Sequence, residues 1–361
     1  MNFDLSDEQK LLRDEARRFL SDAASFGRVR AHLDGGAPFD RALWERLAAL
    51  GWLGVALPEA HGGLGLGPLE CCVLHEELGR SLAPVPFFST VGLAAPLLGA
   101  STAAEGHALL PAIAQGRCVV AVAGWEPRGD AASLRWDGRA LSGRVTPVAD
   151  LAGADRIVAI ARDAANAPAI LLLDPTHDRV SRRPLEGLCP LRPHGALELR
   201  DVPAVVLAQG DDVHRQLTAL RDEAAVLVAF EQVGGAEAML AMARDHALQR
   251  YAFGRPIGGN QAVKHRLADV LVAIELARSN AYYAAWAMEQ QRSELPRAAA
   301  AARVSATQAF ELAAEEGLHL HGGIGYTWEC NAHLYVRRAR LLAVSAGNPD
   351  FWSARLLAPA A

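Results

Sequence analysis

The stretch of residues 213–261 constrains the fold of this chain most, because a long helical pattern in it ends abruptly. Apolar side chains recur along its first part at the spacing of one helix face. They are Val226, Phe230, Val233 and Leu240. The run Phe253-Gly254-Arg255-Pro256 that follows contains a glycine and a proline, which end helices. The stretch therefore predicts a long buried helix followed by a tight turn.

Two polar side chains flank this turn. Arg250 lies at the predicted end of the helix, and the amide of Gln261 follows eleven residues later. A guanidinium group matches the geometry of a phosphate, so the pair would suit a phosphate-bearing cofactor. An ordinary helix end with a solvated arginine is the alternative, because a positive charge also suits the C-terminal end of the helix dipole. The local chemistry leaves both interpretations open.

The composition predicts a globular protein and argues against several other classes. At 361 residues, the chain is long enough for two or three domains. Its 36 Lys and Arg against 41 Asp and Glu give a net charge of -5, which argues against a nucleic-acid surface. The N-terminus is polar, and no apolar run reaches the roughly 18 residues of a membrane-spanning helix. We therefore expect a cytoplasmic protein.

The spacing of cysteine and histidine residues does not predict a metal site. The five cysteines are scattered without a CxxC pair, which argues against zinc and against a disulfide framework. His75-Glu76-Glu77 lacks the second histidine of a zinc helix. His319 and His321 are two residues apart and would diverge on a helix. We therefore expect no metal.

The hydrophobic period changes twice along the chain, so the elements follow the order α, then β, then α. Residues 1–117 read as helical, and residues 213–361 return to helical patterns. Between them, residues 118–212 contain short apolar or alternating runs that Gly, Pro and Asp separate, which predicts an antiparallel β domain. Asp137-Gly138 is a strong hairpin signal within it. The runs cover residues 119–122, 134–136, 157–160, 170–173, 197–199 and 205–207. The sequence thus predicts an α+β fold of three domains.

Two motifs resemble those of the acyl-CoA dehydrogenase family. The first is Arg250-x-x-Phe253-Gly254 with Gln261, and the second, about seventy residues later, is His321-Gly322-Gly323-Ile324-Gly325-Tyr326. The resemblance covers essentially the whole chain, and it implies an N-terminal helical domain, a middle β domain and a C-terminal four-helix bundle. It also implies FAD as cofactor, with the Arg and the Gln on the FAD of a neighbouring subunit. The glycine pair would let backbone approach FAD.

Further residues of the expected FAD site adjoin these motifs. Phe253, His319 and His321 lie within or beside them. The run Trp125-Glu126-Pro127-Arg128-Gly129-Asp130 resembles the family's Thr-Glu-Pro loop, but it is shorter, and Trp125 replaces the threonine. A second flavin-stacking run of the family is not recognisable in residues 144–150. The resemblance therefore implies a flavin wall that is altered or that is built with another subunit.

The reaction implied by the resemblance removes two hydrogens from the α and β carbons of an acyl thioester. A carboxylate takes the α-proton while a hydride passes to the flavin, so the protein needs a general base. The implied partners are an acyl-CoA substrate, an electron-transfer flavoprotein or similar acceptor, and further subunits. These subunits would form either a homo-oligomer or a heterotetramer with a second dehydrogenase-like chain.

Both positions that carry the base in family members hold alanine here, Ala224 and Ala346. Glu231 is the first substitute, because it follows Ala224 by seven residues on nearly the same helix face, about 10 Å along the axis. Burial among apolar neighbours would raise the pKa of its carboxyl group towards that of a working general base. An ion pair between helices or a subunit contact is the alternative role. Glu223, whose charged neighbours suggest a helix start in solvent, and Glu329 are the other candidates.

Three functional hypotheses follow. The first is an FAD-dependent acyl-CoA dehydrogenase with Glu231 as an unusual base. The second is a non-catalytic subunit that completes the FAD site of a heteromeric acyl-CoA dehydrogenase, a type that often handles bulky acyl groups such as steroid side chains. The third is a flavin oxidase or monooxygenase on the same scaffold, which nothing specific in the sequence favours.

Overall fold

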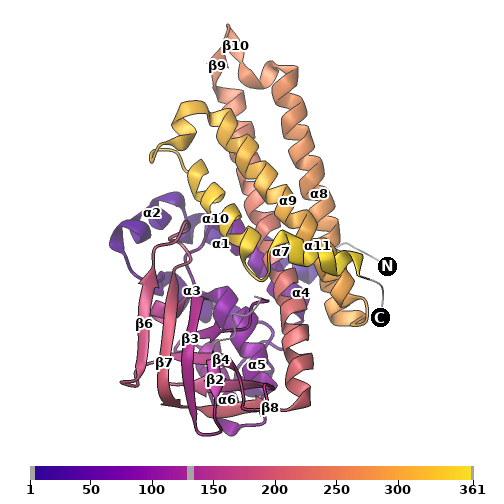
Figure 1. Ribbon diagram of the computed structural model, residues 1–361. Coiled ribbons are helices and arrows are strands. Elements are labelled where there is room, and N and C mark those ends of the chain that lie inside the picture. The colour runs from indigo at the N-terminus through magenta and orange to yellow at the C-terminus, as the bar shows by residue number, and fades with distance from the viewer. Residues whose placement is uncertain (1–4, 128–133, 359–361) are drawn as a thin grey trace. The chain divides into compact units, whose positions relative to one another are not determined.

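The computed structural model describes residues 5–127 and 134–358, and the chain in it forms two compact units (Figure 1). The helical unit comprises Met1–Val29, Pro68–Ala83 and Ala225–Ala361. The sheet unit comprises Arg30–Gly67 and Pro84–Ala224. The two units are therefore interleaved in sequence.

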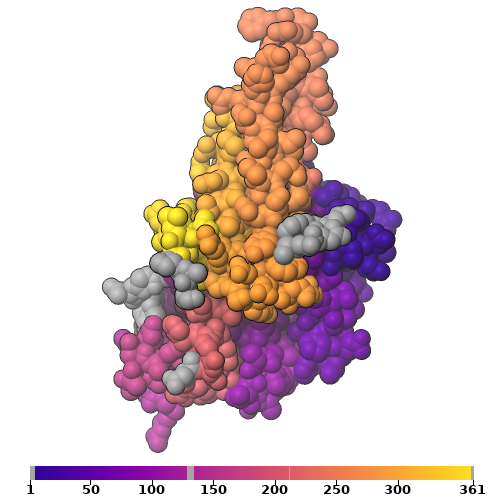
Figure 2. Space-filling view, turned by 90° about the vertical axis from the view of Figure 1, so that its right-hand side faces the viewer, coloured from indigo at the N-terminus to yellow at the C-terminus, as the bar shows by residue number. Residues whose placement is uncertain are grey.

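The helical unit is built from long helices that pack side by side. Its elements are α1 (Asp7–Ala23), α4 (Pro68–Ser81), the second part of α7 (Asp211–Gln249), β9 (Tyr251–Ala252), β10 (Arg255–Pro256), η5 (Ile257–Gly259), α8 (Gln261–Gln290), α9 (Leu295–His321), η6 (Gly322–Tyr326), α10 (Ala332–Val344) and α11 (Pro349–Leu357). A capping box starts α1, since the backbone N–H of Gln9 donates to Ser6 Oγ and that of Ser6 to Gln9 Oε1. Helix α8 lies at the surface along the face seen in orange in Figure 2.

Two glycines let helices α4 and α7 cross with their backbones in contact. A Cβ added at Gly79 of α4 would lie closer than 3.0 Å to the carbonyl oxygen of Glu231. A Cβ added at Gly234 of α7 would lie equally close to the carbonyl oxygen of Glu76. Because the obstacle is backbone at both points, any larger residue would force the helices apart. This crossing places Glu231 deep in the helical unit.

The sheet unit contains an eight-stranded sheet flanked by shorter helices. The strand order is β6-β7-β3-β2-β4-β5-β8, with β1 paired to β4. The strands are β1 (Val120–Ala123), β2 (Leu134–Trp136), β3 (Ala140–Ala149), β4 (Arg156–Arg162), β5 (Pro168–Leu173), β6 (Val180–Leu185), β7 (His194–Pro203) and β8 (Val205–Gln209). The outer strand β6 exposes Arg182, Arg183 and Pro184.

The helical elements of the sheet unit precede the strands in sequence, except η4, which lies between β3 and β4. They are α3 (Arg41–Ala49), η1 (Trp52–Gly54), η2 (Glu59–His61), η3 (Phe88–Ala94), α5 (Ala95–Gly99), α6 (Ala104–Ala114) and η4 (Leu151–Gly153). Helix α3 begins at the N-cap Asp40, whose carboxylate accepts from the N–H of Leu43, and the chain leaves it through Gly51 at a φ of 75°. Helix α2 (Phe26–Gly35) and helix α7 each run from one unit into the other.

The predicted α+β class with the element order α, β, α is confirmed. The hairpin predicted at Asp137-Gly138 is also present, because β2 pairs antiparallel with β3 and the N–H of Asp137 donates to the carbonyl of Ala140. The predicted antiparallel pairing also holds for most neighbours in the sheet, with two exceptions. Strand β4 pairs in parallel with β1 over four residues and with β2 at Arg135. Runs of apolar residues fit parallel and antiparallel neighbours alike, so the pattern carried no information on direction.

Helix α7 has the length and apolar character of a membrane-spanning helix. Its most apolar window is 72% buried inside the protein, as expected for the central helix of a folded core.

Candidate cofactor and substrate site

A two-stranded hairpin brings the first pair of predicted site residues together. Helix α7 ends at Gln249, and β9 pairs antiparallel with β10, with Ala252 opposite Arg255. The N–H of Ile257 donates to the carbonyl of Arg250 at 2.8 Å, which closes the base of the hairpin. Helix α8 then begins at Gln261. Arg250 and Gln261 therefore lie at the two ends of this hairpin, where helices α7 and α8 adjoin it.

Both polar groups at the base of the hairpin are available for a ligand. The side chains of Arg250 and Gln261 are exposed, and within the described residues the structure records no hydrogen bond or ion pair for either. Phe253, at the tip, is fully exposed at 102% and has a φ of 54°, followed by Gly254 at 79°. Tyr251 of the same hairpin is 64% exposed, so the hairpin presents two aromatic side chains at the surface. The hairpin thus presents an exposed cation and an exposed amide that suit an anionic group.

The second motif lies at the end of helix α9. His321 is its last residue, and its Nδ1 donates to the carbonyl of Gly317 at 2.7 Å. Gly322 has a φ of 64°, and a Cβ added at Gly322 or Gly323 would meet no atom within 4 Å. The backbone of this pair is thus open to close approach. His319 is exposed.

A histidine stack joins this second motif to helix α7. The rings of His246 and His321 are stacked with centroids 4.4 Å apart. Burial lowers the pKa of His246, and the neighbouring His321 and Arg250 lower it further. A neutral His246 therefore lies between the hairpin and the glycine pair, one turn before Arg250. Histidine 246 was not predicted as a site residue, and only its spacing of four residues from Arg250 pointed to it.

The predicted base Glu231 forms a buried ion pair. Its Oε1 lies 2.9 Å from Nη1 of Arg338 on α10, and the two side chains are each 3% exposed. The ion pair is the alternative role considered for Glu231 above. The arginine was overlooked, although the signal was present: Leu334, Arg338 and Leu342 are buried at helical spacing, so Arg338 lies in an apolar stripe.

A second buried arginine, Arg303 of α9, fixes the chain around Ala346. Its guanidinium donates to Gln232 Oε1 at 2.7 Å and to the carbonyl of Ser345 at 2.8 Å. Burial lowers its pKa to about 9. On the other side, the indole N–H of Trp352 donates to the carbonyl of Ala346 at 2.9 Å. Ala346 itself is fully buried with a φ of 56°. The turn at this family base position is thus firmly built but carries no carboxylate.

The other candidates for a base occupy different settings. Ala224 is fully buried on α7. The expectation that residues 221–223 start a helix in solvent is wrong, because α7 begins at Asp211 and Asp222 is only 2% exposed. Glu223 is half-buried, and Glu329 is exposed.

Trp125 and Glu126 follow strand β1 in the sheet unit. Gly124, at a φ of 79°, turns the chain, and Trp125 is buried against Phe88 with ring centroids 6.1 Å apart. Glu126 is half-buried. The rest of the predicted loop, residues 128–130, lies outside the described residues.

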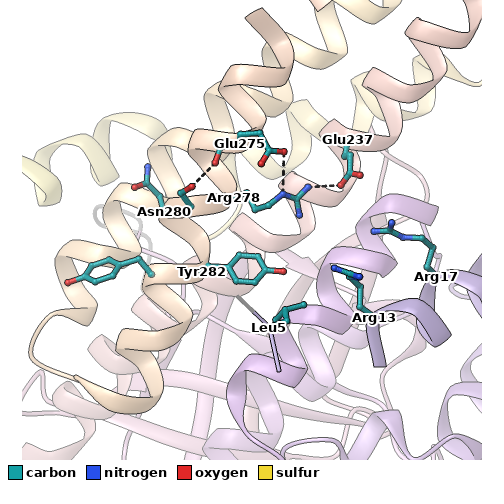
Figure 3. A pocket seen from close by; sticks show the side chains of 10 residues that line it. Leu5, Arg13, Arg17, Glu237, Glu275, Arg278, Asn280 and Tyr282 are labelled. Atoms are coloured by element: carbon teal, nitrogen blue, oxygen red, sulfur yellow. Dashed lines mark hydrogen bonds and ion pairs between the residues drawn. The ribbon is translucent and has the colours of Figure 1, made fainter. Parts of the chain in front are cut away.

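Two cavities open in the helical unit, and none of the described residues that line them is a predicted site residue. One, of about 740 Å³, lies between α1, α7 and α8 (Figure 3). Arg13 and Arg17 project into it from α1 towards Arg278 of α8, whose Nη2 is bonded to Glu237 at 2.6 Å. The other, of about 670 Å³, lies between α1, α4, α7 and α10 and has His246 in its wall.

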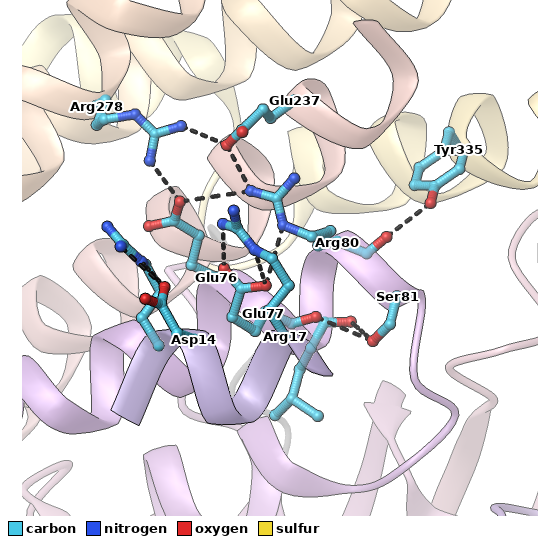
Figure 4. Close-up of polar contacts among 11 residues, drawn as sticks. Asp14, Arg17, Glu76, Glu77, Arg80, Ser81, Glu237, Arg278 and Tyr335 are labelled. Atoms are coloured by element: carbon cyan, nitrogen blue, oxygen red, sulfur yellow. Dashed lines mark hydrogen bonds and ion pairs between the residues drawn. The ribbon is translucent and has the colours of Figure 1, made fainter. Parts of the chain in front are cut away.

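A charge network borders both cavities (Figure 4). Its core consists of three carboxylates and three guanidinium groups. They are Glu76, Glu77 and Glu237, and Arg17, Arg80 and Arg278. Glu275 lies 3.6 Å from Arg278 at the edge of the network. Glu77 is completely buried and binds Arg17 at 2.7 Å and Arg80 at 3.0 Å. The network connects four helices, α1, α4, α7 and α8, through these ion pairs. The described residues hold no group of three or more metal-ligating side chains.

Comparison with known proteins shows to which family this chain belongs. The profile described as "Acyl-CoA dehydrogenase, N-terminal domain" matches residues 6–117, and "Acyl-CoA dehydrogenase, C-terminal domain" matches residues 214–354. The chain belongs to the acyl-CoA dehydrogenase family. It is therefore related to oxidoreductases that use FAD, and the resemblance seen in the two motifs is confirmed.

Several acyl-CoA dehydrogenases are similar over nearly the full length. The acyl-CoA dehydrogenase IpdE2 of Mycobacterium tuberculosis is 32% identical over 337 residues, which is 92% of this chain and 91% of that protein. The solved structure described as the "Tcur3481-Tcur3483 steroid ACAD G363A variant" is 33% identical, with a TM-score of 0.88 over 97% of this chain and 96% of that one. The ChsE4-ChsE5 complex from M. tuberculosis is 27% identical, with a TM-score of 0.88 over 99% and 98%.

Proposed function

We propose that this chain takes part in the FAD-dependent α,β-desaturation of an acyl-CoA thioester as the subunit that completes an FAD site, while a second dehydrogenase-like chain supplies the base. One observation carries this proposal. Both base positions of the family hold buried alanines, and the substitute carboxylate Glu231 is engaged by Arg338 at 2.9 Å with 3% exposure on each side. A general base must reach a substrate proton, and a carboxylate sealed in an ion pair does not offer that reach.

The surface of the helical unit supports the cofactor part of the proposal. Arg250 and Gln261 are exposed, the backbone of Gly322 and Gly323 is open, and the tip residue Phe253 is bare. The side chains of Arg250 and Gln261 suit a diphosphate. The backbone of Gly322 and Gly323 leaves room for the cofactor to come close. When bound, FAD supplies the acceptor for the hydride. In this proposal Arg250 and Gln261 hold its diphosphate, and the hairpin reaches an FAD that lies on another subunit.

Two-chain relatives support the heteromeric assembly. Two of the similar solved structures carry two protein names each, Tcur3481-Tcur3483 and ChsE4-ChsE5, and the first is described as a steroid ACAD. We infer by similarity a bulky, steroid-like acyl-CoA as substrate class and an electron-transfer flavoprotein or similar acceptor. The cytoplasmic location stays a prediction from the sequence.

The test is co-expression with a second family chain that carries glutamate at the position matching Ala346. We expect the pair to co-purify and retain FAD, measured by absorbance near 450 nm, and to oxidise an acyl-CoA with a flavin-accepting dye. We expect Glu→Gln in the partner to abolish turnover without loss of FAD. The proposal fails if this chain alone retains one FAD per polypeptide and oxidises acyl-CoA.

The role of Glu231 as the base remains a prediction. The same preparation can distinguish it from a base on the second chain. If Glu231 takes the α-proton, Glu231→Gln removes turnover while the protein stays folded with FAD bound. If the second chain holds the base, turnover per folded complex survives in that variant.

A further inference from the structure

The sheet unit packs an indole where the related loop of the family has a threonine. Strand β1 ends at Ala123, and Gly124 turns the chain at a φ of 79° with its α-carbon against the carbonyl of Ile160. No side chain fits at this turn, because an added Cβ would lie 2.8 Å from that oxygen. The tight turn directs Trp125 onto Phe88, with ring centroids 6.1 Å apart and an interplanar angle of 59°. Trp125 is 5% exposed and Phe88 4%.

Phe88, against which the indole packs, belongs to a segment held by several hydrogen bonds. Phe88 begins η3, a π-helical segment whose residues are all buried. The Thr90 hydroxyl donates to the carbonyl of Val120 and accepts from its N–H at 3.1 Å, so η3 is bonded directly to β1. Ser89 donates to Asp150 at 2.6 Å. Phe88 and Trp125 therefore both adjoin segments that are tied to strand β1.

Two arginines contact Phe88 and the backbone of Trp125. The guanidinium of Arg192 lies over the ring of Phe88, 5.4 Å from its centroid, with 8% exposure of the residue. Arg221 of α7 donates from Nε to the carbonyl of Trp125 at 3.0 Å. The indole is thus packed against an anchored ring, and its own backbone is held by a guanidinium.

We propose that Trp125 is a plug. Its indole ring fills space that a smaller residue at this position would leave open to an isoalloxazine ring. This rests on the proposed function, because it explains why the chain would use the FAD of a partner and not one seated on its own loop. An indole is far bulkier than a threonine side chain, and its burial between fixed groups leaves it no alternative position. Exchange of Trp125 for threonine should therefore free the space beside Phe88 that the indole ring now fills.

The experiment uses the full chain alone and lumiflavin, an isoalloxazine ring without a diphosphate tail. Lumiflavin avoids the contribution of Arg250 and Gln261. Binding is followed by quenching of flavin fluorescence for the unaltered chain, for Trp125→Thr, and for Trp125→Phe, which keeps an aromatic ring in place. We expect at least tenfold tighter binding of lumiflavin to Trp125→Thr than to the unaltered chain or to Trp125→Phe. Thermal unfolding confirms that each variant is folded, and Trp125→Ser serves if the threonine variant is not.

The outcomes separate the plug from the proposed function. Lumiflavin binding by the unaltered chain as tight as by Trp125→Thr overturns the plug. So does a folded Trp125→Thr, or Trp125→Ser in its place, that gains no affinity. Either result leaves the heteromeric proposal standing, since that depends on FAD retention and turnover with a partner chain. Conversely, a chain that turns over alone refutes the heteromeric role whatever lumiflavin does.

Discussion

Glu231 of α7 and Arg338 of α10 form an ion pair that is almost completely shielded from water, with 2.9 Å between Oε1 and Nη1. Removal of one member leaves the other as a buried charge without this partner, and such a loss destabilises a protein by about 3–5 kcal/mol. We expect Glu231→Gln and Arg338→Met each to lower the free energy of unfolding by this amount in urea denaturation. The double exchange Glu231→Leu with Arg338→Met should recover most of the loss. A single variant with unchanged stability would contradict the pairing.

Cofactor retention should depend on the base of the hairpin. In an assembled complex, Arg250→Ala should weaken FAD binding about 10- to 100-fold, because a charge-assisted hydrogen bond contributes about 1.5–3 kcal/mol. Gln261→Ala should have a smaller effect, since its amide is neutral. Equilibrium dialysis of FAD measures both. Arg255→Ala is the matched control, because Arg255 is exposed on the same hairpin and is bonded to Asn260. Equal losses for Arg255→Ala and Arg250→Ala would remove the specific role of Arg250.

The crossing of α4 and α7 should tolerate no side chain larger than hydrogen at Gly79 or Gly234. Alanine at either position places a Cβ against a backbone carbonyl, so we expect a loss of stability of about 1–3 kcal/mol or more. Gly27→Ala on α2 is the control, because an added Cβ there meets nothing within 4 Å. That exchange should raise stability by about 0.5–1 kcal/mol through helix propensity. Thermal melts of the three variants distinguish the cases, and a stable Gly234→Ala would show that the helices can separate.

The stack of His246 on His321 predicts a pH dependence of stability. Burial, His321 and Arg250 lower the pKa of His246, so the folded chain binds this proton less readily than the unfolded chain does. As the pH falls through the ordinary histidine value of about 6.5, the unfolded state gains a proton first, and stability decreases. We expect the melting temperature of the wild type to fall more steeply between about pH 7.5 and 5.5 than that of His246→Gln. Parallel curves would exclude His246 as the titrating group.

Sequence patterns predicted the fold well because its main elements follow simple periods. The apolar stripe of α7 and the six apolar runs of the sheet unit match helix α7 and strands of the sheet. Strand β6 was missed, because Arg182, Arg183 and Pro184 give it neither alternation nor apolar character, and only its pairing with β7 makes it a strand. The parallel pairing of β1 with β4 was missed for the same reason: pairing direction depends on partners distant in sequence.

The candidate site was less predictable, because its decisive contacts join segments far apart in sequence. Arg250 and Gln261 were found because they belong to one short motif, eleven residues apart. The partner of Glu231 lies 107 residues away, and the residues around Trp125 come from η3, residue 192 and α7. Single-sequence periodicity can show that Arg338 lies on an apolar face, but it cannot say which carboxylate meets it.

The composition of the outer strand β6 also bears on how the protein behaves when it is concentrated or newly made. An extended segment that paired with β6 would find no amide hydrogen at Pro184. It would also have to displace water from the charged side chains of Arg182 and Arg183. Fibre-like growth from this border is therefore disfavoured, even before any subunit has joined.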